Sequence, residues 1–192
     1  MALVCKRLSA LSVSPQLLQD VAITLEVDAA GVKAQQLLPW LARHASKILA
    51  LKLTAQLAAG DPIPAGQWKA LTASCLTAAC AAGALQSLNL CGAWDISSWA
   101  WLPLAGSKLQ WLAITLPAAT QPAAIDIPLG HLSALTALQL LAPQVLVAPA
   151  CTLPPALRFL AILNSAQAHP VPQQVRRCFT LQLYALTICR IG

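Results

Sequence analysis

A chain of 192 residues, of which 58% are hydrophobic and 9% charged, is long enough for one folded domain. This composition excludes a disordered chain, which is poor in apolar residues and rich in charge. The net charge of +6 comes from basic residues scattered along the chain, whereas nucleic-acid binding requires a clustered basic stripe. We therefore expect a packed domain that binds no nucleic acid.

In chain order, the predicted elements alternate between short strands and connectors. A weak strand pattern at residues 18–23 is followed by a predicted helix at 32–45. A second strand pattern lies at 48–53, and an alanine-rich helix at 68–82 is predicted to end at Gly83. Farther along, strand patterns recur between proline-rich connectors. Because proline disfavours long helices, we expect short helical turns or extended segments there.

Each strand pattern is a copy of one apolar motif, L-x-x-L-x-L, in which Ile or Val can replace Leu. The first residues of the copies are Leu18, Ile48, Leu85, Leu109, Leu135, Leu157 and Leu183, at spacings of 30, 37, 24, 26, 22 and 26 residues. In L-x-L both apolar side chains point to one face of a strand, and a single strand cannot bury that face. The pattern therefore predicts stacked parallel strands that share a core, joined by crossover connections.

The motif resembles that of the leucine-rich-repeat family, whose period is about 20 to 29 residues. The copies from Leu85 onward fit this period, whereas the earlier ones need longer insertions. The family has Asn or Cys eight residues after the first Leu, where this chain has Ala93, Pro117, Pro143 and Ser165. The resemblance implies an α/β leucine-rich-repeat solenoid over residues 31–192, with strands on the concave face and helices or irregular connectors on the convex face. The alternative is that the leucines form the core of an ordinary α/β domain.

The N-terminal sequence has a second resemblance. The segments VCKRL at residues 4–8 and SPQLL at residues 14–18 precede the repeats, and they resemble the C-terminal half of an F-box domain. This implies an F-box-like remnant, together with the first strand, over residues 1–30, and substrate selection for a cullin-type ubiquitin ligase. The half that docks the ligase adaptor would lie before Val4, so adaptor binding is expected only with an extended N-terminus. The alternatives are an N-terminal cap on the repeats, a scaffold on a cytoskeletal or axonemal assembly, and a truncated fragment without function.

Residues between the core leucines are expected to face the concave side and to bind a protein partner. The candidate residues are Asn89, Trp111, Thr115, Gln139, Leu141, Phe159 and Leu163. An apolar surface with aromatic anchors is typical of protein-binding sites. The alternative is that the chain's own connectors cover Trp111 and Phe159. A second tryptophan cluster (Trp94, Trp99 and Trp101) is expected to pack beneath a connector on the convex side.

The sequence predicts no enzymatic activity, metal site, cofactor or catalytic residue. Glu26 and Asp28 are close in sequence but are expected on the surface, and no His lies at metal-binding spacing from a Cys. Cys75 and Cys80 point in different directions on the predicted helix, and no phosphate-binding or nucleophile-elbow motif occurs.

The remaining expectations concern location. The longest apolar candidate for a membrane span, residues 71–85, has 15 residues, whereas about 20 are needed, so no membrane association is expected. The seven cysteines follow no secretory signal. We therefore expect free thiols and a cytoplasmic, nuclear or cytoskeleton-associated location.

Overall fold

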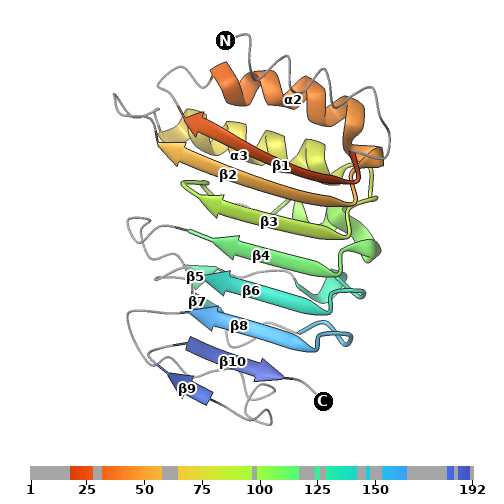
Figure 1. Ribbon diagram of the computed structural model, residues 1–192, viewed down its shortest axis with the longest axis vertical. Coiled ribbons are helices and arrows are strands. Elements are labelled where there is room, and N and C mark those ends of the chain that lie inside the picture. Colours follow the sequence, from red (N-terminus) through yellow and green to blue (C-terminus); the bar gives the residue numbers. More distant parts are fainter. Residues whose placement is uncertain are drawn as a thin grey trace.

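The computed structural model of the protein is an α/β structure with one large sheet (Figure 1). The described residues are 18–27, 32–57, 65–96, 99–116, 124–125, 129–141, 146–147, 153–163, 181–183 and 186–190. Residues 4–8 and 14–17 of the predicted F-box-like segment lie outside them.

Six parallel strands form the main part of the sheet and are adjacent in chain order. They are β1 (Asp20–Val27), β2 (Ala50–Leu57), β3 (Ser87–Gly92), β4 (Trp111–Thr115), β6 (Ala137–Leu141) and β8 (Phe159–Leu163). A separate parallel pair comprises β5 (Ala124–Ile125) and β7 (Leu146–Val147). The prediction of parallel strands that follow one another in space is confirmed for these six strands.

The connectors change from long helices to short turns along the chain. The two long spacings between copies contain α2 (Val32–His44) with η2 (Ala45–Lys47), and α3 (Ala65–Cys80). Two shorter spacings contain η3 (Leu102–Lys108) and η4 (Leu129–His131). Both predicted helices are confirmed. The second ends at Cys80, three residues before Gly83, which has a φ of 58° and donates its N–H to the carbonyl of Cys80 at 3.0 Å.

The apolar positions of the motif are aligned across the sheet by the strand register. One ladder joins Val21, Leu51, Leu88, Leu112, Leu138 and Leu160, and a second joins Ile23, Leu53, Leu90, Ile114, Leu140 and Ile162. The described side chains of these ladders are at most 7% exposed. A one-residue slip would turn a whole ladder toward solvent, so burial specifies the register.

The backbone just before each strand follows one repeated hydrogen-bond arrangement. A carbonyl before or at the start of one strand accepts the N–H groups of two consecutive residues in the next copy. The acceptors are Gln19, Leu49, Gln86, Gln110 and Thr136, at N···O distances of 2.7–3.0 Å. Five successive steps with the same pattern show that the copies share a local backbone conformation as well as an apolar motif.

The last predicted copy, at Leu183, Leu186 and Ile188, does not continue the parallel stack. Leu183 lies in β9 (Leu181–Leu183), and the other two lie in β10 (Leu186–Arg190). β10 is antiparallel to β8, and β9 is antiparallel to β10. Only two residues separate β9 from β10, and so short a connection joins only antiparallel strands, because a parallel crossover needs a dozen residues or more. The prediction of a further parallel strand was therefore wrong.

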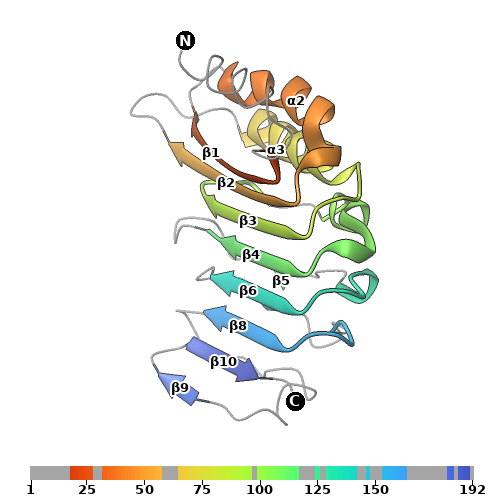
Figure 2. The ribbon, with the colours of Figure 1, turned by 45° about the vertical axis from the view of Figure 1, so that its right-hand side comes forward.

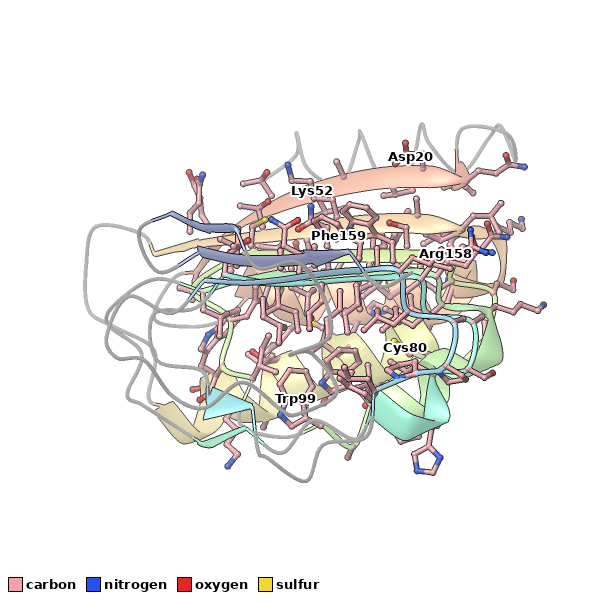
Figure 3. All side chains as sticks on the ribbon, turned by 90° about the horizontal axis from the view of Figure 1, so that it is seen from below. Asp20, Lys52, Cys80, Trp99, Arg158 and Phe159 are labelled. Atoms are coloured by element: carbon pink, nitrogen blue, oxygen red, sulfur yellow. The ribbon has the colours of Figure 1, made fainter. Side chains whose placement is uncertain are left out.

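Helices α2 and α3, with the turns η3 and η4, lie on one side of the sheet, beside the leucine ladders (Figure 2). The opposite face, which we call the open face, carries the alternate residues of each strand. Figure 3 shows Asp20, Lys52 and Phe159 on this side of the sheet and Cys80 and Trp99 on the other. Among the described residues, no helix combines the length and apolar character needed to cross a bilayer.

Candidate functional site

The open face divides into a polar and an apolar half. On β1 and β2, the exposed open-face side chains include Asp20, Thr24, Glu26 and Lys52. On β4, β6 and β8, the described open-face side chains are mostly apolar: Trp111, Ala113, Ala137, Leu141, Phe159 and Ala161. The apolar half therefore comprises the strands that carry all of the predicted partner-binding residues except Asn89, which lies on β3.

Trp111 and Phe159, which we call the aromatic pair, stack on the open face although β6 separates their strands. Their ring centroids are 6.3 Å apart and their planes differ by 12°. Both residues are in register with Ala137 of β6, and its small side chain leaves room for the two rings to approach each other above it. Such an offset aromatic contact contributes about 0.5–1.5 kcal/mol beyond the area it buries.

Trp111 remains 41% exposed within this contact. Phe159 is half-buried, and three alanines form the floor around the rings: Ala113, Ala137 and Ala161, each at most 6% exposed. We call the aromatic pair and these alanines the aromatic patch. The alternative in which the chain's own connectors cover both aromatic residues does not hold for Trp111, which is partly accessible, whereas Phe159 is half-buried.

The other candidate residues lie along the same strands but are farther from the aromatic pair. Asn89 and Gln139 are in the register row of Ala113, two residues along the strands. Thr115 and Leu141 share a row four residues from the aromatic pair, which corresponds to about 13 Å at about 3.3 Å per residue. Leu163 is in that row by backbone register, and its side chain lies outside the described part. Trp111 and Phe159 are thus in contact, whereas Leu141 is separate.

Basic residues next to the aromatic patch were not among the predicted site residues. Lys108, His131 and Arg158 are exposed and lie in the connectors that enter β4, β6 and β8. A signal for them exists in the sequence, because each lies within four residues of the first Leu of a copy. Lys108 and Arg158 lie within three residues of Trp111 and Phe159 along the chain, whereas His131 ends η4, which packs against η3 on the helix side of the sheet.

The second tryptophan cluster lies on the helix side of the sheet, as predicted. Trp94 and Trp101 are at most 1% exposed, and Trp99 packs partly buried against the same core. The indole N–H of Trp94 donates to the carbonyl of Leu53 at 3.2 Å, and that of Trp68 donates to Ala93 at 2.7 Å. Trp68 and Trp94 also stack, with centroids 5.4 Å apart. These residues hold α3 to the ends of β2 and β3.

The buried titratable groups belong to the helix side and not to the aromatic patch. Burial raises the pKa of both Cys75 and Cys80 to about 12, which keeps these thiols protonated and poor nucleophiles. Among the described residues, no three His, Cys, Asp or Glu side chains are grouped as metal ligands.

His44 is 6% exposed, and its ring packs on Trp40 with centroids 5.1 Å apart. Its buried Nδ1 has no hydrogen-bond partner. Burial, with the positive charges of Lys47 and Arg43, lowers the pKa of His44 below its ordinary value of 6.5.

Stability is therefore expected to depend on pH through His44. The unfolded chain takes up a proton near pH 6.5, before the folded chain does, so stability is full above that value and falls as the pH decreases toward the folded pKa. Thermal unfolding between about pH 8 and about pH 5 measures this decrease. His44→Gln should remove it, whereas His131→Gln, at an exposed position, should keep it. An unchanged pH profile in His44→Gln would assign the decrease to other groups.

No protein-family model matches the chain, and no curated protein or solved structure matches it either.

Proposed function

We propose that this protein recognises another protein through the open face of its sheet, with the aromatic patch as the main contact. The observation that carries the proposal is a 41% exposed tryptophan stacked on a phenylalanine over an alanine floor. Tryptophan is enriched among the residues that dominate binding energy, particularly where surrounding contacts exclude water. The proposed activity is binding, without catalysis or a cofactor.

The uncovered sheet face supports this proposal. Parallel sheets are usually covered on both faces, whereas here the helices lie on one side and the open face carries exposed side chains (Figure 3). On β1 to β3 that face is mostly polar, which suits contact with water. On β4, β6 and β8 it is mostly apolar, and burying it against a partner would contribute about 25 cal/mol per Å² of apolar area.

We further propose that the stack is a leucine-rich-repeat solenoid. The support comes from the aligned leucine ladders, the five repeated carbonyl contacts before the strands, and helices and turns that lie on one side of the sheet. In such an architecture each repeat contacts mainly its neighbours, and one strand face presents a continuous binding surface. The candidate residues on β3, β4 and β6 belong to that surface.

The expectation of a ubiquitin-ligase receptor rests on residues 4–8 and 14–18 and remains a prediction from the resemblance. Protein recognition does not depend on it, because the aromatic patch is built from residues of β4, β6 and β8 and includes none of those N-terminal residues. Affinity purification of the protein distinguishes the contexts. Adaptor and cullin subunits among the bound proteins would support the ligase, and a cytoskeletal assembly would support the scaffold.

Replacing Trp111 is expected to weaken partner binding without unfolding the protein. Removing a tryptophan that anchors an interface costs about 2 kcal/mol or more, which corresponds to a Kd about 30-fold higher. A partner is first identified by affinity purification. Its Kd is then measured by isothermal titration calorimetry with the intact protein and with Trp111→Ala.

The matched control is Leu104→Ala. Leu104 is 44% exposed and lies in η3, away from the open face, so its replacement should leave the Kd unchanged. Circular dichroism should show that both variants are folded. If Trp111→Ala binds the partner as tightly as the intact protein does, the aromatic patch is not the recognition site.

A further inference from the structure

We propose that the partner segment bound at the aromatic patch is an acidic peptide with a large apolar side chain. This inference rests on the proposed function and names its ligand class. The juxtaposition that carries it is an exposed aromatic pair on two strands, β4 and β8, each of which is entered by a connector with an exposed basic side chain. We call these two residues, Lys108 and Arg158, the basic edge.

The aromatic patch is suited to one large apolar side chain. The ring of Trp111 is exposed, and the buried alanines beside it leave a low floor between taller side chains. In the next register row, Asn89 and Gln139 flank Ala113 and bring amide groups that can hydrogen-bond to a peptide backbone. The Oδ1 atom of Asn89 accepts a hydrogen bond from the Sγ of Cys91 at 3.1 Å, which helps to orient this amide.

The charges around the patch select an acidic ligand. Arg158 directly precedes Phe159, and Lys108 lies three residues before Trp111. Of the carboxylates whose side chains the structure describes, Asp20 and Glu26 lie on β1, three strands from β4, and Asp95 follows the carboxyl end of β3. Three strand spacings are about 14 Å, beyond the Debye length of about 8 Å at physiological salt. An acidic segment on the patch therefore meets attraction from the basic edge and little repulsion from the carboxylates that the structure describes.

The same features disfavour two other occupants. A second copy of the chain bound face to face would bring two identical basic edges to one symmetric interface, where they would repel each other. A nucleic acid would have two basic side chains, Lys108 and Arg158, available at this edge, whereas high affinity for a phosphate backbone usually needs more. With their ring centroids 6.3 Å apart, Trp111 and Phe159 stack on each other and leave no slot for a base between them.

The test is selection of a displayed library of random 12-residue peptides on the folded full-length protein. The expected result is a set enriched in Asp and Glu next to Trp, Phe or Leu, whose binding is lost in Trp111→Ala. A synthetic peptide from that set should bind the double variant Lys108→Glu/Arg158→Glu about tenfold more weakly, and added salt should weaken its binding to the intact protein. Selection on the double variant should enrich Lys and Arg in place of acidic residues.

The matched control is Lys69→Glu/Lys47→Glu. Both lysines are exposed but lie on α3 and before β2, so this double variant should keep the affinity for acidic peptides. Trp111-dependent peptides without enrichment of acidic residues would overturn the inference and leave the proposed function intact. If no selected peptide depends on Trp111 for binding, both the inference and the proposed function are overturned for peptide ligands. If a 20-nucleotide single-stranded oligonucleotide binds more tightly than the selected peptides, and this binding is lost in Lys108→Glu/Arg158→Glu, the ligand class is nucleic acid and not an acidic peptide.

Discussion

Gly92→Ala is expected to lower the free energy of unfolding by about 3 kcal/mol. Gly92 ends β3 with a φ of 89°, a backbone conformation that side chains rarely adopt. A Cβ at this position would lie 2.0 Å from the carbonyl oxygen of Ala55, its register partner on β2. The same oxygen accepts the N–H of Ala93 at 3.0 Å, so the two strands cannot separate there without losing a hydrogen bond.

Two other glycines separate the contributions of backbone strain and steric contact. Gly83 has a φ of 58° but open space around its Cβ position, so Gly83→Ala should cost only about 1 kcal/mol. Gly66 in α3 has open space and no positive φ, so Gly66→Ala should be neutral or slightly stabilising. Urea unfolding followed by circular dichroism measures all three. A Gly92→Ala variant no less stable than Gly83→Ala would show that the close contact with Ala55 is relieved without cost.

Trp94→Ala is expected to destabilise the fold by about 3–5 kcal/mol. The side chain is fully buried, stacks on Trp68 and donates its indole N–H to the carbonyl of Leu53. Its removal leaves a cavity between α3 and the ends of β2 and β3, and takes a hydrogen bond from a buried carbonyl. A loss of this size is a large part of the total stability of a domain, so urea unfolding should give a much lower midpoint.

A second pair of variants isolates the hydrogen bond. Trp94→Phe keeps a buried aromatic ring but removes the indole donor, whereas Trp101→Phe makes the same exchange at a buried indole N–H that has no partner. Trp94→Phe should therefore be less stable than Trp101→Phe by about 1 kcal/mol. Equal stabilities would mean that the Trp94 hydrogen bond makes no net contribution.

The amino-acid sequence by itself determined the parallel stack from β1 to β8 and the side of the sheet on which each side chain lies. The apolar residues of L-x-x-L-x-L alternate with the open-face residues, and burial of one face excludes a one-residue slip of Leu88, Leu112 and Leu138. The connector lengths also follow from the sequence, since the long spacings before Ile48 and Leu85 accommodate α2 and α3.

Only the tertiary structure decided which open-face residues form the candidate site. The pairing of Trp111 with Phe159 depends on the small side chain of Ala137 on the strand between them, and the basic edge depends on the same stacking of β4, β6 and β8. The reversal of β10 likewise depends on pairing with β8. A local motif specifies the direction in which side chains point, whereas contacts between distant segments depend on how whole strands stack, and that is a property of the assembled sheet.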